Sequence, residues 1–348
     1  MAGEENYSPY LIIGKLSRDF ILTREGKDLN DLPGGHLLYS AIGMAPWERN
    51  PGLVSRIGKN FPETFIENLT RYHFNTDGLK ILSEDLEHRN FISFYEPEEG
   101  FFPERSGRKS VLSLYFHAGK AFPRELLGYT GSTGNIGSGM ERTRETVLVR
   151  DIPRSYLEAR CIHLCPLDYL SHNLLPQAFS GTVRPTITVQ SGSAYMQPFF
   201  FDSVKPLISG LSAFITREKH LRSLFSEKYR IGDTDDMMKI LLGYGAENIV
   251  VKMEDGSYRF INRVDGTVRS LDPRDEGQRD KIGELSCFCG AYLIGLNETY
   301  DYVKAVAYGA ARASLLKNEL NPCNNLNVLE SLLNEKIRLM ENRVEGGV

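Results

Sequence analysis

The residues of this chain that could do chemistry do not follow the spacings of common catalytic or metal sites. Ser286 has no neighbouring histidine or aspartate in the pattern that activates a serine nucleophile. His117, His163 and His172 lack the spacing of metal ligands. The five cysteines match neither a zinc template nor a disulfide framework, so we expect them to be small buried apolar side chains. No metal site is predicted.

Two charged residues lie at the ends of apolar runs. Asp19 follows the run Tyr10–Gly14, and it is either an acid that binds a ligand or an ordinary turn residue. Lys252 ends the run Asn248–Lys252, where a solvated charge is favoured over a ligand. Whether Asp19 and Lys252 can bind a ligand depends on the strands that position them.

The composition is that of an ordinary globular protein. The chain has 348 residues, of which 41% are hydrophobic and 25% charged, and its net charge is −4 with mixed signs. This balance argues against a general nucleic-acid or membrane surface. No apolar run approaches the roughly 18 residues of a membrane span, and the acidic first residues differ from a signal peptide. We therefore expect a cytoplasmic protein that binds neither nucleic acid nor membrane.

Predicted strands and helices alternate along most of the chain. The strands are expected at 10–14, 53–58, 161–165, 186–190, 212–215 and 248–252. The helices are expected at 36–45, 61–72, 200–209, 235–244, 286–296 and 302–317, with a turn at 75–78 and a hairpin starting at 258. This order predicts an α/β fold with a mainly parallel sheet and helices on both faces.

Two regions depart from the alternation. Strand-like runs at Asn90–Tyr95 and Ser110–Tyr115 predict a small β lid, built from segments near 18–32 and 88–118. After one α/β domain at residues 1–320, we expect a C-terminal helix near 326–341 within 321–348, ending in a flexible tail.

Five segments, in order, resemble the signatures of ribokinase-type carbohydrate kinases, the PfkB superfamily. They are the first strand with Gly14 and Asp19, the Gly-Gly turn and helix at 32–41, the motif at 54–63, and the helix pair at 289–299 and 305–314. The stretch Asp280–Leu296 resembles the family's late signature, Asp-Thr-Thr-Gly-Ala-Gly-Asp. The resemblance implies a ribokinase-like three-layer sandwich with a β lid, and a homodimer formed through that lid.

The same resemblance implies an ATP-dependent phosphotransferase that uses Mg²⁺ and acts on a sugar or nucleoside hydroxyl. The family's substrate-binding positions correspond to Asp19, Gly34, Gly35 and Tyr39. Gly34 and Gly35 also have a structural reason to be glycine, because a tight turn needs positive φ angles. Packing is the favoured role of Tyr39 and of the neighbouring His36.

The anion hole and the catalytic base of the family differ in this chain. Gly283, Glu284 and Leu285 stand where the family places bare backbone around the phosphates, and Glu284 adds a negative charge there. Ser286 replaces the aspartate that deprotonates the acceptor hydroxyl, and a serine cannot act as a base without an activating partner. Asp280 is too far along the chain to substitute simply.

The nucleotide region also differs. The family's Asn-x-x-Glu motif aligns with Arg217 and His220, which removes oxygen ligands that Mg²⁺ prefers, although a shifted alignment makes Glu218 the carboxylate. Near the nucleotide strand, the run from Lys252 to Gly256 carries a glutamate where the family has glycine.

Two functions remain open at this point. The favoured one is a degenerate member, a pseudokinase that binds a small sugar-like or nucleoside-like ligand or a protein partner. The alternative is an active ATP- and Mg²⁺-dependent kinase that uses a relocated carboxylate, Glu284 or Glu218, as its base.

Overall fold

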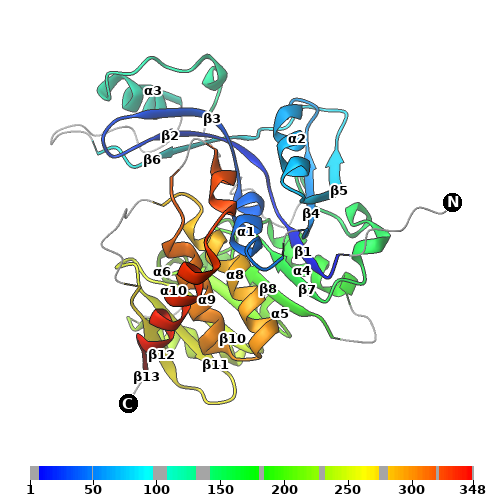
Figure 1. Ribbon diagram of the computed structural model, residues 1–348, viewed down its shortest axis with the longest axis vertical. Coiled ribbons are helices and arrows are strands. Elements are labelled where there is room, and N and C mark those ends of the chain that lie inside the picture. Colours follow the sequence, from blue (N-terminus) through cyan, green and yellow to red (C-terminus); the bar gives the residue numbers. More distant parts are fainter. Residues whose placement is uncertain are drawn as a thin grey trace.

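A ten-stranded sheet forms the centre of the molecule (Figure 1). The structure, a computed structural model, describes residues 8–48, 50–96, 108–130, 142–179, 184–226, 232–273, 281–318 and 321–346. The strand order is β13-β12-β11-β10-β9-β8-β7-β1-β4-β5. The strands are β1 (Tyr10–Ile13), β4 (Gly52–Ile57), β5 (Asn75–Ile81), β7 (Cys161–Leu164), β8 (Thr186–Gln190), β9 (Ala213–Arg217), β10 (Asn248–Lys252), β11 (Tyr258–Asn262), β12 (Val268–Leu271) and β13 (Val344–Gly346). Neighbouring strands from β10 to β5 run parallel, whereas β11, β12 and β13 pair antiparallel.

Helices cover both faces of this sheet, which confirms the predicted α/β fold. One face carries α1 (His36–Met44), α2 (Glu63–Arg71), α8 (Glu284–Thr299), α9 (Tyr302–Ser314) and α10 (Glu330–Asn342). The other carries α4 (Tyr169–Leu174), α5 (Phe201–Ile208), α6 (Glu218–Phe225) and α7 (Thr234–Gly243). Alternate residues of one strand enter different cores: Phe214 of β9 packs on the second face, and Ala213 and Ile215 pack on the first.

A separate three-stranded sheet forms the lid, which projects from one end of the molecule (Figure 1). It consists of β3 (Asp28–Gly34), β2 (Ser17–Leu22) and β6 (Arg89–Ser93), in that order. Phe20 and Leu22 pack under α3 (Arg108–His117), so this chain itself covers that face of the lid. The homodimer through the lid stays a prediction, and it would have to use the edges of the sheet or the outer side of α3. Lid residues 97–107 lie outside the described part of the chain.

Three local predictions were wrong. The strand expected at Ser110–Tyr115 belongs to α3, since Val111 and Tyr115 are buried on one side at the helical spacing of four. The turn expected at Asn75–Gly78 is the start of β5, where Gly78 allows a close approach: an added Cβ would lie 2.4 Å from the Leu53 carbonyl oxygen. The flexible tail expected from Glu345 was wrong in part, because Val344–Gly346 forms β13; residues 347–348 lie outside the described part of the chain.

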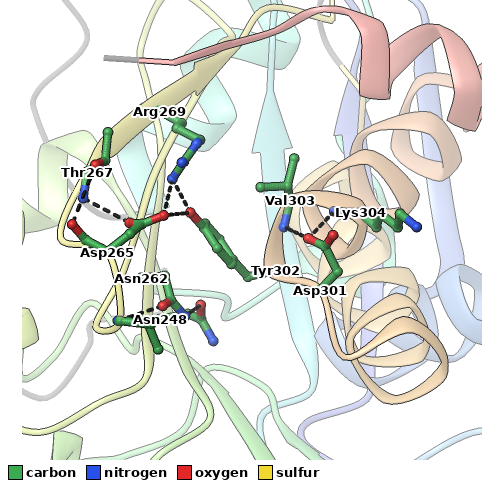
Figure 2. Close-up of polar contacts among 10 residues, drawn as sticks. Asn248, Asn262, Asp265, Thr267, Arg269, Asp301, Tyr302, Val303 and Lys304 are labelled. Atoms are coloured by element: carbon green, nitrogen blue, oxygen red, sulfur yellow. Dashed lines mark hydrogen bonds and ion pairs between the residues drawn. The ribbon is translucent and has the colours of Figure 1, made fainter. Parts of the chain in front are cut away.

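Polar contacts fix the β11–β12 hairpin to the start of α9 (Figure 2). Asp301 caps α9 by accepting from the N–H groups of Val303 and Lys304, at 2.8 and 3.2 Å. The Tyr302 hydroxyl donates to Asp265 at 2.6 Å, and Arg269 pairs with the same carboxylate at 2.7 Å. Because α9 packs along α8, these contacts also hold α8 in place.

The remaining expectations concern cysteines and membrane spans. All five cysteines are free and buried, as predicted. None of the described helices has both the length and the apolar character needed to cross a bilayer.

Candidate functional site

The carboxyl ends of three neighbouring parallel strands bring polar side chains to one edge of the sheet. Gln190 ends β8, Arg217 ends β9 and Lys252 ends β10, and Arg217 and Lys252 are register partners. The helices α1 and α8 both begin at this edge, because Ser286 at the start of α8 contacts both His36 and Gln190. Ligands of open α/β sheets bind outside the carboxyl ends of the strands, so this edge is the candidate site.

Ser286 has the histidine partner that its sequence neighbourhood lacks. The Oγ of Ser286 lies 2.8 Å from Nδ1 of His36, which is 250 positions away in the chain. The same hydroxyl donates to Oε1 of Gln190 at 3.0 Å. Ser286 and Gln190 are buried, whereas His36 is exposed. The three residues form a hydrogen-bonded chain that leads from the core to the exposed side chain of His36.

The electrostatic surroundings keep His36 neutral. Burial among protein groups, followed by the positive charges of Arg217, Lys15 and His220, lowers its pKa to about 4. Water reaches one side of the exposed ring and screens these charges in part. The direction of the shift still leaves a neutral imidazole near pH 7, with a lone pair available on one nitrogen.

The start of α8 offers unused hydrogen-bond donors. No side chain caps the helix, and within the described residues the main-chain N–H groups of Glu284, Leu285 and Ser286 meet no acceptor. The side chain of Leu285 is buried in the core with Phe288 rather than lining the turn. The backbone at this helix start is therefore open, and it carries the partial positive charge that favours an anion.

Glu284 forms an internal ion pair. Its Oε1 lies 3.0 Å from Nζ of Lys252, which also donates to the Gly256 carbonyl oxygen at 2.6 Å and lies 4.1 Å from the Tyr258 ring centroid. The prediction of a solvated Lys252 was wrong, because only 7% of its side chain is exposed. Burial lowers the pKa of Lys252, and Glu284 opposes that shift. The negative charge of Glu284 is thus balanced by a buried lysine.

Glu218, the other candidate base, is held by neighbouring groups. Its Oε1 accepts from Arg222 at 2.8 Å and its Oε2 from the Glu254 N–H at 3.0 Å. Burial raises the pKa of this carboxyl, but the two donors outweigh it, and the net direction is downward. A carboxylate with both oxygens engaged and a lowered pKa is a poor base. Sequence reasoning also missed α6, which begins at Glu218.

Arg217 and His220 place positive or potentially positive groups beside Lys252. Desolvation, then Lys219 and Arg217, lower the pKa of His220 to about 4. The Nδ1 atom of His220 is buried and has no hydrogen-bond partner within the described residues. His220 is thus neutral near pH 7, and the cations Arg217 and Lys252 are the groups at this edge that suit a phosphate.

Asp19 lies at the lid end of the site. Its Oδ1 accepts from the Ser17 hydroxyl at 2.6 Å and from Asn90 at 3.1 Å, while Oδ2 has no hydrogen-bond partner within the described chain. Asp19 is 1% exposed, and burial raises its pKa to about 6, against the two hydrogen bonds. Gly34 is needed beside it, because an added Cβ would lie 2.0 Å from Oδ2.

Tyr39 connects the two ends of the site. Gly283 has a φ of 71°, and a Cβ at this position would lie 2.0 Å from the Tyr39 ring. Asp19 is near enough to the Tyr39 hydroxyl to raise its pKa, after the larger effect of burial. Tyr39 is 6% exposed, so packing against the Gly283 turn is its main observed contact. Gly35, the residue before α1, has a φ of 101° and lies against the Lys15 carbonyl.

Within the described ranges, no three His, Cys, Asp or Glu side chains are grouped to hold a metal ion.

A surface pocket lies away from this site. It has a volume of about 560 Å³ and lies between α2 and the end of β4, lined by residues such as Ile57, Phe61 and Ile66. It contains neither Asp19 nor Ser286. Asp280 lies outside the described residues.

The structure thus unites most of the predicted site residues and adds two. Sequence reasoning missed His36 as the partner of Ser286, and it missed Gln190 entirely. The only available signal was that His36 directly follows the Gly34-Gly35 turn, which the resemblance already placed at the substrate.

Comparisons with known proteins support the same fold. The chain is 22% identical over 308 residues to a cytidine kinase of Thermococcus kodakarensis, covering 87% of this chain and 94% of that protein. Ribokinase of Thermotoga maritima superimposes with a TM-score of 0.64 at 16% identity, covering 95% and 100% of the two chains. An uncharacterized sugar kinase of Pyrococcus horikoshii in complex with ATP superimposes with a TM-score of 0.60 at 15% identity, covering 90% of this chain and 94% of that chain.

No family model matches the chain. Its structural neighbours are nevertheless ribokinase- and PfkB-type sugar and nucleoside kinases. The chain has the ribokinase-like α/β fold, and the resemblance inferred from its sequence is confirmed at that level.

Proposed function

We propose that this protein transfers a phosphoryl group from ATP to a hydroxyl of a small sugar- or nucleoside-class acceptor. The observation that carries the proposal is the uncapped start of α8, where three N–H groups meet no acceptor among the described residues and lie beside Arg217 and Lys252. Donors at a helix N-terminus, with cations, are what a triphosphate requires. Asp19 at the lid end offers Oδ2 to an acceptor hydroxyl.

The structure weakens two objections to ATP binding that the sequence raised, the charge of Glu284 and the side chain of Leu285. The charge of Glu284 is balanced by Lys252 instead of facing the phosphates alone. The Leu285 side chain packs into the core instead of lining the turn. The described residues fit the phosphates better than the metal, so Mg²⁺ would enter with the nucleotide, as this ion commonly does. The kinases among the relatives support the acceptor class.

The test is ADP formation from ATP and MgCl₂ with ribose, fructose, cytidine and adenosine as separate acceptors. We expect release that depends on one acceptor and falls about 100-fold in Asp19→Asn, because the variant loses a charged hydrogen-bond acceptor for the substrate. The ATP-induced shift in Tm should persist in that variant, since Asp19 lies at the lid end. ADP release that no acceptor increases would contradict the proposal.

A second candidate is the degenerate protein, which binds a small ligand or a protein without phosphoryl transfer. The observation favouring it is that both candidate carboxylate bases are occupied, Glu284 by Lys252 and Glu218 by Arg222. In that case a sugar or nucleoside should raise Tm by linkage while ATP with MgCl₂ gives neither a shift nor turnover.

A further inference from the structure

The hydrogen bonds around Ser286 fix the tautomer of His36. The Ser286 hydroxyl has one proton, and it donates that proton to Oε1 of Gln190. The 2.8 Å contact between Ser286 Oγ and His36 Nδ1 then needs its proton from the imidazole. In a neutral ring this leaves Nε2 without a proton, as a hydrogen-bond acceptor.

The free nitrogen belongs to an exposed ring. Within the described residues Nε2 of His36 has no hydrogen-bond partner, and the side chain is exposed at the first position of α1. His36 directly follows Gly35 and lies beside the start of α8. Its ring therefore lies between Asp19 at the lid end and the helix start where the phosphates are proposed to bind. A hydroxyl bound between those ends can therefore reach a bare imidazole nitrogen.

The charged groups around His36 keep it in the basic form. Arg217 at the end of β9, Lys15 after β1 and His220 on α6 all disfavour an imidazolium ion. Among the described residues, no carboxylate contributes to this balance. These charges therefore favour the neutral imidazole over the imidazolium ion.

We propose that His36 is the catalytic base of this protein and that Ser286 and Gln190 position it. This inference rests on the proposed phosphoryl transfer. The acceptor O–H bond breaks and its proton moves to Nε2 of His36. The oxygen forms a bond to the γ-phosphorus of the nucleoside triphosphate, and the bond from that phosphorus to the bridging oxygen breaks, leaving the electron pair on the nucleoside diphosphate. Gln190 accepts from Ser286, Ser286 accepts from Nδ1, and the imidazolium that forms keeps this hydrogen bond.

The arrangement explains how the site can lack the usual carboxylate. A serine at position 286 cannot take the proton, but it can orient a histidine that does. Neither Glu284 nor Glu218 is required in this role, which agrees with their ion pairs. The proposed base, His36, stands at the start of α1, one hydrogen bond away from Ser286 at the start of α8, where the family has its aspartate.

Turnover of variants tests the assignment. In His36→Gln, acceptor-dependent ADP formation should fall roughly 10²–10⁴-fold, the usual contribution of a general base. Its ATP-induced Tm shift should remain. Gln190→Met should lower kcat about 10-fold with little change in KM for ATP, because Ser286 can then donate to Nδ1 and change the tautomer. Ser286→Ala should lower kcat, whereas Ser286→Thr, which keeps the hydroxyl, should retain most of the wild-type kcat. The exposed His73, changed to Asn, is the matched control.

Two measurements on the wild type do not depend on activity. Nitrogen-15 NMR of labelled histidine should show Nε2 of His36 unprotonated at pH 7. Diethyl pyrocarbonate, followed by peptide mass spectrometry, should modify His36 but spare His172, whose two ring nitrogens are hydrogen-bonded at 2.7 Å.

The outcomes separate the two proposals. Turnover that survives in His36→Gln, or a proton found on Nε2, overturns the role of His36 and leaves the kinase function standing. A wild type without acceptor-dependent turnover overturns the function and, with it, the role of His36. Loss of turnover in His36→Gln with ATP binding retained and a bare Nε2 supports both.

Discussion

The two ends of the candidate site differ in how far their residues depart from the resemblance. At the lid end, Asp19 keeps its place, with Ser17, Asn90 and Gly34 arranged around its carboxylate. At the α8 end, the side chains have changed while Gly283 and the open helix start remain. Side-chain chemistry can be redistributed among neighbouring elements, but a backbone geometry has few substitutes. In the proposed function, this difference corresponds to a rearrangement of the α8 end rather than its loss.

The largest effect is expected where the α8 end depends on backbone shape. Gly283→Ala should lower the free energy of unfolding by about 4 kcal/mol, because a left-handed alanine costs about 1–2 kcal/mol and its Cβ would overlap the Tyr39 ring. Chemical denaturation measures the loss. The double variant Gly283→Ala with Tyr39→Ala should cost less than the sum of the two single changes. Additive effects would mean that Tyr39 does not pack on this turn.

The lid end should show its own signature in the dependence of stability on pH. The folded-state pKa of Asp19 is raised to about 6, so its contribution to stability is present below pH 4 and lost as the pH rises through 6. Relative to Asp19→Asn, the wild type should lose about 3 kcal/mol of unfolding free energy between pH 4 and pH 8. Urea denaturation at several pH values measures this difference.

The control for that series is Asp77→Asn, at an exposed position of β5. The difference in unfolding free energy between this variant and the wild type, measured over the same pH range, is the reference. A difference for Asp19→Asn that does not change with pH would show that the Asp19 carboxylate is already hydrated, and the contrast between the two ends would weaken.

A smaller effect is expected from the ion pair at the α8 end. Glu284→Gln should cost about 2 kcal/mol, since it leaves the buried Lys252 ammonium unpaired while Glu284 itself is partly exposed. Lys252→Met should cost less, because Glu284 then remains at a helix N-terminus that favours it. Glu330→Gln, at the equivalent first position of α10, is the matched control.

A double-mutant cycle completes this test. The variant with both Glu284→Gln and Lys252→Met should be more stable than Glu284→Gln alone, because no unpaired charge remains buried. If Glu284→Gln also abolished turnover while His36→Gln did not, Glu284 would be the base and the proposed rearrangement would be wrong.

Much of the fold could be predicted from the sequence. The apolar runs of β1, β7, β8 and β10 and the Gly34-Gly35 turn identified the parallel sheet and the resemblance. Errors arose where local patterns were ambiguous. The run at 110–115 looked like a strand but packs as a helix against the lid sheet, and Gly78 looked like a turn but serves close strand packing. In both cases tertiary contacts decided between conformations of similar local preference.

The sequence could predict which residues lie in the candidate site, but not which side chains contact one another there. The sequence alone determined that Ser286 replaces an aspartate, that Glu284 brings a charge to the helix start, and that Asp19 follows the first strand. Only the tertiary structure paired Glu284 with Lys252, turned Leu285 into the core and brought His36 to Ser286. The physical reason is that parallel strands gather their carboxyl ends at one edge, so residues up to 250 positions apart become neighbours there.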